Sequence, residues 1–160
     1  MFEAQTEWIS PESFPDLKGH KYIAIDLETR DPGLKSKGSG ALVNEGEIIG
    51  IAVAVEGWSG YYSFGHKEGN FFDESAVMNW IKDVCALPCV KLFHNAMYDV
   101  CWLRAYGVQI NGHIVDTMVM ASLIDENRFW YSLNSLSLDY LNQVKDETAL
   151  RAAADKAGID

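Results

Sequence analysis

Two acidic residues, Asp26 and Glu28, lie in a short segment whose other residues are mostly apolar. Residues 22–28 are rich in β-branched and aromatic side chains, which predicts a β-strand. Side chains alternate along a strand, so both carboxylates project from one face. At a separation of about 5 Å and an effective dielectric of about 20, two such charges repel by about 3 kcal/mol, and a hard divalent cation with oxygen ligands relieves that repulsion. The same pattern also fits the solvated face of an edge strand without a metal.

A second candidate group contains His94, Asn95 and Asp99, where a predicted strand over 90–93 meets a predicted helix over 95–106. Asn95 and Asp99 are four residues apart and share a face in the first turns of that helix, where the helix dipole favours negative charge and bound phosphate. This arrangement suits a metal-binding aspartate beside an amide that holds a substrate group. Alternatively, Asn95 is only the N-cap and Asp99 a solvated acid. His94 is interpreted as a hydrogen-bonded residue at the junction rather than a ligand.

A third acidic residue, Asp116, follows the short apolar pair 114–115 and precedes Thr117, where a helix is predicted to begin. Asp is a preferred N-cap residue, so we interpret Asp116 first as a cap and only second as a further ligand.

Basic residues are also frequent around the strand that carries Asp26. They either guide an anionic strand to a metal site or belong to a solvated loop. These residues are Lys18, Lys21, Arg30, Lys35 and Lys37.

The elements that must position these side chains follow a change in hydrophobic period along the chain. Three strands joined by short turns come first and predict an antiparallel meander. Alternating helices and strands follow, which indicates an α/β sheet flanked by helices. The predicted strands cover 22–28, 47–55, 61–64, 90–93 and 114–115. The predicted helices cover 73–85, 95–106, 117–124, a segment that starts after Ser132, and 146–157, and residues 30–46 are expected to form a loop.

The composition limits the classes of function. The length of 160 residues predicts one domain that spans 1–160. A net charge of −10 disfavours a sequence-independent DNA coat, but not a nuclease, because a carboxylate site binds phosphate through its cations. No apolar run of about 18 residues occurs and the N-terminus is acidic, which predicts a cytoplasmic protein without a membrane segment. The cysteines are expected to be reduced core residues: Cys85, Cys89 and Cys101.

Taken together, these motifs resemble those of the DEDD, or DnaQ-like, 3′–5′ exonucleases. Residues 26–29, Asp-Leu-Glu-Thr, are similar to the first motif of that family, and residues 94–99, His-Asn-Ala-Met-Tyr-Asp, are similar to the second. Residues 114–117 and 132–136 also resemble the segments that follow in the family. The resemblance covers about residues 17–145 and is strongest to the proofreading domain of family-A DNA polymerases, especially those of bacteriophages.

This resemblance implies a ribonuclease H-like α/β fold, with a mixed sheet that begins with three antiparallel strands, and a two-metal hydrolysis of phosphodiester bonds. In that picture Asp26, Glu28 and Asp99 hold two Mg²⁺ or Mn²⁺ ions, and Glu28 also contacts the terminal group of the substrate. The implied partners are the 3′ end of single-stranded DNA and a polymerase domain in the same or another polypeptide. Three further residues are implied to contact the strand: Asn95 near the scissile phosphate, Thr29 at the 3′ end and Leu34 as an apolar wedge between the last bases.

One feature of the family is missing from the sequence. The third motif, Tyr-x-x-x-Asp or His-x-x-x-x-Asp on a later helix, has no match after Asp116. We therefore expect the chain to be a piece, or a split-gene product, of a longer polymerase, and to be weak or inactive alone. Two other interpretations stay open: an RNA-trimming exonuclease of the same superfamily, and a catalytically inactive module that docks on a replication partner.

Overall fold

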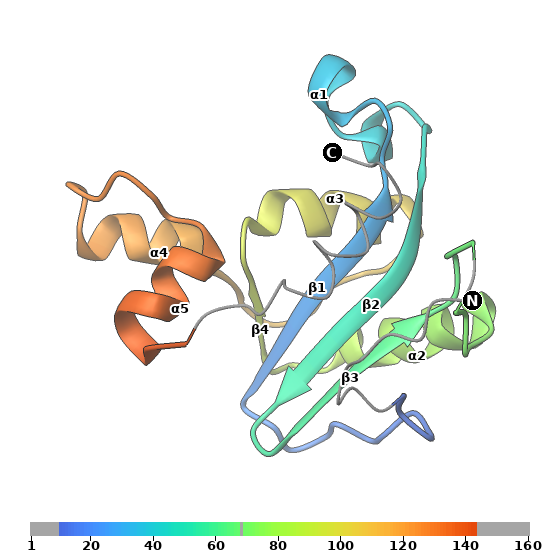
Figure 1. Cartoon of the computed structure of the whole chain (residues 1–160). Coiled ribbons are helices and arrows are strands. Elements are labelled where there is room, and N and C mark those ends of the chain that lie inside the picture. Colours follow the sequence, from blue (N-terminus) through green and yellow to red (C-terminus); the bar gives the residue numbers. More distant parts are fainter. Residues whose placement is uncertain (1–9, 68, 144–160) are drawn as a thin grey trace.

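The computed structural model of the chain describes residues 10–67 and 69–143, and its centre is a five-stranded sheet in the order β3-β2-β1-β4-β5 (Figure 1). β2 pairs antiparallel with both β1 and β3, whereas β4 pairs parallel with both β1 and β5. The predicted meander and the predicted α/β sheet are therefore confirmed. The strands are β1 (Tyr22–Arg30), β2 (Glu47–Val55), β3 (Trp58–Ser63), β4 (Val90–Phe93) and β5 (Ile114–Asp116).

Helices flank this sheet and begin at residues that the sequence marks as caps. The side chain of Asp73 accepts a hydrogen bond from the Ala76 N–H at 2.9 Å, and that of Ser132 accepts one from the Ser135 N–H at 3.3 Å. After the helix over Ala96–Ala105, Gly107 has a φ of +73°, which favours glycine and ends the helix. The helices are α1 (Leu34–Lys37), α2 (Glu74–Ala86), α3 (Ala96–Ala105), α4 (Thr117–Ile124) and α5 (Leu133–Leu141), and a 3₁₀ helix covers Gly40–Leu42.

The segment 30–46, predicted as a loop, is partly helical, because it contains α1 and the 3₁₀ helix. Contacts between separated residues hold it: Asp31 Oδ2 accepts from the Gly40 N–H at 2.9 Å, and Lys37 Nζ donates to Glu45 Oε1 at 2.7 Å. Such contacts leave no periodic trace in the sequence, so pattern reasoning missed these short helices. The helix predicted over 146–157 lies outside the described residues.

One face of the sheet carries the hydrophobic core. Ile23, Ile25 and Leu27 of β1 are buried, as the alternation along the strand predicts, and they belong to one cluster with apolar residues of β2, α2 and α3. Tyr62 of β3 is also fully buried and stacks on Phe14, with 5.2 Å between the ring centroids. This packing holds β1, the central strand, by the face that is turned toward the core.

The opposite face of β1 is more open and carries polar side chains. Figure 1 shows α4 and α5 as a pair of helices that projects beside the sheet, past β4. Asp26 and Glu28 are exposed on this face. The fold therefore supports one face of β1 rigidly and leaves the face with the two carboxylates accessible.

Two expectations from composition concern thiols and membranes. Cys85 is buried, Cys89 and Cys101 are partly buried, and all three are free thiols. The predicted core position is thus confirmed for Cys85, whereas Cys89 and Cys101 are only partly buried.

Within 10–67 and 69–143, no helix has the length and apolar character needed to cross a membrane.

Candidate active site

The candidate residues meet because three parallel strands end at the same edge of the sheet. β1, β4 and β5 run in one direction, and Phe93 at the end of β4 pairs with Asp116 at the end of β5. Asp26 and Glu28 lie toward the end of β1, and α3 begins directly after β4. In open α/β sheets, ligands bind outside the carboxyl ends of the strands.

Asp26 and Glu28 share the open face of β1, while Ile25 and Leu27 point into the core. The predicted common face is therefore confirmed. The alternative of an edge strand is wrong, because β1 lies between β2 and β4 at the centre of the sheet. The register of β1 against β2 shifts between Glu28 and Thr29, and such irregularities re-aim side chains near functional sites.

Asp99 is buried, with 3% of its surface exposed. α3 directs its side chain at β1, where the Leu27 N–H donates a hydrogen bond to Asp99 Oδ1 at 3.2 Å. Leu27 is the residue between Asp26 and Glu28, so this bond brings the Asp99 carboxyl to the part of β1 that carries both acids. The alternative that Asp99 is a solvated acid of the first helical turn is therefore wrong.

The environment of Asp99 disfavours its charged form. Burial first, and then the charge of Asp26, raise the pKa of Asp99 to about 7, although the hydrogen bond from Leu27 lowers it. A smaller increase comes from Asp116. A carboxyl that ionises this reluctantly beside another carboxylate is stabilised in its charged form by a bound cation.

The donor chemistry of these side chains fits a hard divalent cation, because Mg²⁺ and Mn²⁺ prefer oxygen ligands. Asp26 and Asp99 offer such oxygens in electrostatic contact, and Glu28 lies on the same face of β1 as Asp26. Among residues 10–67 and 69–143, no three His, Cys, Asp or Glu side chains are arranged so that they could hold a metal ion. Among the described residues, Asp99 thus lies close to Asp26, but Asp26, Glu28 and Asp99 do not form a closed set of ligands.

Asp116 caps two helices. It is the N-cap of α4, where Oδ1 accepts from the Met118 N–H at 2.9 Å, which confirms the predicted cap. It also accepts from the N–H groups of Asn95 at 3.1 Å and Ala96 at 2.8 Å, at the start of α3. Burial opposes ionisation, but these backbone donors lower the pKa of Asp116. Its carboxylate therefore joins the first turns of α3 and α4.

The capping of α3 by Asp116 leaves the Asn95 side chain without that task. Asn95 occupies the N-cap position with a left-handed φ of 64°, and its side chain makes no capping hydrogen bond. Asn95 is thus the N-cap residue by position, but its side chain caps no N–H group, and the residue is exposed. His94 is the hydrogen-bonded junction residue that the sequence predicts, since its Nδ1 lies 2.9 Å from Thr117 Oγ1.

A chain of hydroxyl groups fixes the end of β1. The Tyr98 hydroxyl donates to Asp31 Oδ2 at 3.1 Å, so in its 2.7 Å contact with Thr29 Oγ1 the Thr29 hydroxyl is the donor. Sequence reasoning missed Tyr98 and Asp31, although Tyr98 stands directly before the candidate acid Asp99. Leu34, the first residue of α1, is 44% exposed.

A comparison over nearly the whole chain identifies its family. A family model described as 3′–5′ exonuclease matches residues 4–157. The chain belongs to the 3′–5′ exonuclease family. The acidic motifs and their order had predicted this family, and the prediction is confirmed.

The chain is similar to DNA polymerases of bacteriophages. It is 32% identical over 162 residues to a DNA-directed DNA polymerase of Pseudomonas phage M6, and the match covers 97% of this chain and 24% of that relative. The chain thus spans about a quarter of the length of this polymerase. The predicted likeness to bacteriophage polymerases is confirmed.

Solved structures share the fold of the chain at low sequence identity. Brucella melitensis NrnC with bound Mg²⁺ gives a TM-score of 0.58 at 14% identity, over 81% of this chain and 58% of NrnC. RNase D of Escherichia coli, an exoribonuclease involved in structured RNA processing, gives 0.56 at 15% identity, over 81% of this chain and 30% of RNase D. The predicted ribonuclease H-like fold is therefore confirmed.

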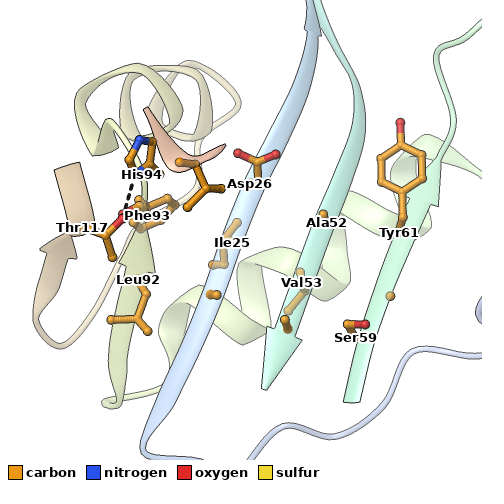
Figure 2. Close-up of a pocket in the computed structure, with 14 residues that line it drawn as sticks. Ile25, Asp26, Ala52, Val53, Ser59, Tyr61, Leu92, Phe93, His94 and Thr117 are labelled. Carbon is orange, nitrogen blue, oxygen red and sulfur yellow. Dashed lines mark hydrogen bonds between the residues drawn. The ribbon is translucent and has the colours of Figure 1, made fainter. Parts of the chain in front are cut away.

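An open cavity of about 580 Å³ lies on the open face of the sheet (Figure 2). Asp26, Tyr61 and Thr117 are among the residues that line it. Figure 2 shows Asp26 and Tyr61 projecting from the same face of the sheet, on either side of Ala52. Sequence reasoning assigned Tyr61 to a strand but not to the site. The feature that could have identified Tyr61 is the exact pairing of β1, β2 and β3, in which Asp26 pairs with Ala52 and Ala52 pairs with Tyr61.

Four of the five basic residues near β1 are engaged in contacts of their own. Three of them form ion pairs on the surface: Lys18 with Asp16, Arg30 with Glu47 and Lys37 with Glu45. Lys21 lies over the ring of Tyr22, at the start of β1 and away from Glu28. These pairings favour the interpretation of a solvated loop over that of a basic rim around the carboxylates.

Proposed function

We propose that the chain is a metal-dependent 3′–5′ exonuclease domain that removes nucleotides from the 3′ end of DNA and proofreads for a DNA polymerase. The observation that carries this proposal is the hydrogen bond from the Leu27 N–H to buried Asp99. It gathers the acids of two separate motifs at one point, and Asp26 and Glu28 flank that point on β1. Membership of the 3′–5′ exonuclease family supports the same activity.

The three carboxylates are the residues that would hold the metal. Asp26, Glu28 and Asp99 provide oxygen donors, and a cation would stabilise the charged form of Asp99, which burial and the charge of Asp26 disfavour. Divalent ions bound there supply an activated water and charge stabilisation at the leaving 3′ oxygen. Asp116 acts as a positioning residue, because it fixes the start of α3 and therefore the helix that carries Asp99.

Three neighbouring residues would bind the strand end. The exposed amide of Asn95 contacts the backbone near the scissile phosphate. The Thr29 hydroxyl gives its hydrogen to Tyr98, which leaves its oxygen lone pairs and its backbone for the 3′ end. The exposed side chain of Leu34 inserts between the last bases.

The relatives give this activity its setting. The chain is similar to a quarter of a bacteriophage DNA polymerase, so we assign it a polymerase domain as partner, in the same polypeptide or in another one. Its substrate is then the 3′ end of single-stranded DNA, and its compartment is the cytoplasm of the bacterial host.

Digestion of a 5′-labelled single-stranded DNA, first with Mg²⁺ and then with Mn²⁺, tests this proposal. We expect slow shortening from the 3′ end and Mn²⁺ binding by calorimetry, both abolished in Asp26→Ala. Asp83→Ala is the matched control, because Asp83 is an exposed acid of α2, which packs on the opposite face of the sheet. The proposal is overturned if the unmodified chain neither shortens the DNA nor binds Mn²⁺. If the chain shortens an RNA of the same sequence faster than the DNA, the proposed substrate is RNA instead of DNA.

A further inference from the structure

The exposed large apolar side chains of the protein are concentrated on α4, α5 and the segment that connects them. Ten of the seventeen such side chains in 10–67 and 69–143 lie between positions 119 and 141. We call these ten side chains the α4–α5 surface. Single exposed apolar residues are common, but a large exposed patch marks an interaction site. The most exposed members are Leu123, Ile124, Phe129, Trp130 and Leu141.

α4 is apolar on every side, which is unusual for a helix at a protein surface. Its sequence is Thr-Met-Val-Met-Ala-Ser-Leu-Ile, and among residues 117–124 only Ala121 is buried. A helix that is hydrophobic all round belongs in an interior. Within 133–141, Leu136 alone is buried, while Leu138 and Leu141 of the same helix are exposed. Both helices therefore carry more apolar surface than the described fold buries.

Contacts within the helix pair hold this surface in shape. The mostly buried side chain of Arg128 forms an ion pair with Asp139 of α5 and lies 5.7 Å from the centre of the Tyr140 ring. The Tyr131 hydroxyl donates to the Asp125 carbonyl at 2.8 Å, which closes the connecting segment. Figure 1 shows the two helices projecting together beside the sheet. The apolar side chains thus stand on a preorganised support, so a partner binds them at a low cost in ordering.

The area of the α4–α5 surface matches what a stable dimer needs. Phe129 is 92% exposed and Trp130 is 75% exposed, so these two rings alone offer about 250–400 Å². With the eight other side chains, the surface offers on the order of 1,000 Å² of apolar area. A specific interface takes about 800 Å² from each partner. The α4–α5 surface is therefore large enough for one standard interface.

The charges near this surface allow a second copy of the same chain to bind there. The net charge of the chain is −10, so two copies repel each other over most of their surfaces. On the helix pair, Arg128 and Asp139 neutralise each other, and the other acids, Asp125 and Glu126, are adjacent in the connecting segment. A twofold axis that sets the two connecting segments apart lets the apolar side chains of both copies meet.

We propose that the α4–α5 surface is the contact through which two copies of this chain form a dimer with twofold symmetry. Closed twofold dimers are the commonest oligomers of soluble proteins. The contact borders the open cavity, because Thr117 of α4 and Leu133 of α5 line that cavity together with Asp26. The second copy therefore lies beside the candidate active site. This inference goes beyond the proposed function and depends neither on metal binding nor on hydrolysis.

Sedimentation velocity of the full chain at increasing concentration tests the dimer. We expect the average mass to rise from that of one chain to that of two, with a dissociation constant of about 10 µM or less. Leu123→Ser, at a position that is 82% exposed, should weaken the dimer at least about tenfold, because a symmetric contact loses both copies of the side chain. Leu42→Ser is the matched control, since Leu42 is 74% exposed but lies in the 3₁₀ helix. Its dimer should dissociate within about twofold of the unmodified one.

Hydrogen exchange at low and high protein concentration locates the contact. Backbone amides of 117–141 should exchange more slowly at high concentration in the unmodified chain but not in Leu123→Ser. Amides of α2, which packs on the opposite face of the sheet, should exchange equally at both concentrations. Trp130→Ala, in the connecting segment, should weaken the dimer in the same direction as Leu123→Ser.

Three outcomes overturn the proposal. If the chain stays monomeric at high concentration, the α4–α5 surface binds a different polypeptide, such as the polymerase. If Leu123→Ser and Trp130→Ala leave the dimer as tight as before, the contact lies elsewhere. Association beyond two copies contradicts the closed twofold symmetry. Each outcome leaves the proposed exonuclease function as it stands, because Asp26 and Asp99 are not part of the α4–α5 surface.

Discussion

Asp99 on α3 accepts a hydrogen bond from the backbone N–H of Leu27, 72 positions earlier in the chain. Backbone pairing alone would place the acids of β1 and α3 near one sheet edge, but this bond fixes their separation. It also buries the Asp99 carboxyl next to Asp26, which stores electrostatic repulsion in the metal-free protein. Several measurable properties of the chain follow from this bond.

The metal-free protein should lose a contribution to its stability as the pH rises from about 4 to 7. The pKa of Asp99 is raised from 3.8 to about 7 in the folded state, so in this window the folded protein binds a proton that the unfolded chain has released. The contribution is fully present below the unfolded pKa and is lost as the pH passes the folded one. We expect Asp99→Asn, unfolded by urea in EDTA, to be more stable than the unmodified chain by about 2–4 kcal/mol at pH 8.

The two proteins should have nearly equal free energies of unfolding below about pH 3, where the Asp99 carboxyl is mostly protonated in both the folded and the unfolded state. Asp83→Asn, which changes an exposed acid of α2, controls for the loss of one negative charge. A constant difference between Asp99→Asn and the unmodified chain from pH 4 to pH 8 would contradict the raised pKa.

Divalent ions should stabilise the chain more at pH 8 than at pH 5. Deprotonated Asp99 is the better ligand, and a cation also removes its repulsion with Asp26. Mn²⁺ at a hundred times its dissociation constant should add about 2.7 kcal/mol to the free energy of unfolding, measured by thermal unfolding with and without EDTA. Asp26→Asn should remove most of this gain, whereas an unchanged gain would place the ion elsewhere.

Asp116 should be more important for stability than a cap of one helix. Asp116→Ala leaves the first N–H groups of both α3 and α4 without their acceptor, so we expect a loss of about 2–4 kcal/mol in urea unfolding. Ser132→Ala, which removes the cap of α5 alone, should cost about 1 kcal/mol. Equal losses in the two variants would show that Asp116 does not join the two helices.

The sequence predicts those parts of the molecule that depend on neighbours along the chain. Alternation placed Asp26 and Glu28 on one face of β1, and the caps Asp73 and Ser132 are where short-range rules put them. The burial of Asp99 depends on Leu27 across the fold, and a helical pattern contains no such information. Because solvated and buried acids look alike in a sequence, the solvated alternative for Asp99 could be rejected only in three dimensions.

The same limit explains two further roles that sequence reasoning missed. Asp116 was correctly predicted as the cap of α4, but its bonds to α3 cross 20 and 21 positions. Tyr61 joins the site through the registers of two strand pairs. An error of one residue in either register would have placed Tyr61 on the core face, so the meander alone could not identify it.

Tyr98 should couple the end of β1 to α3 through its hydroxyl. Tyr98→Phe removes one donor to Asp31 and one acceptor for Thr29, so we expect a loss of about 1–2 kcal/mol in the free energy of unfolding. Thr29→Val removes the other end of the shared bond, and the double variant should therefore cost at least about 0.5 kcal/mol less than the sum of the single losses. Tyr62→Phe combined with Thr29→Val should be additive, because the Tyr62 hydroxyl binds Ser13 on the core side. Additive losses for Tyr98→Phe and Thr29→Val would mean that the contact between their hydroxyls contributes nothing to holding Thr29 at the site.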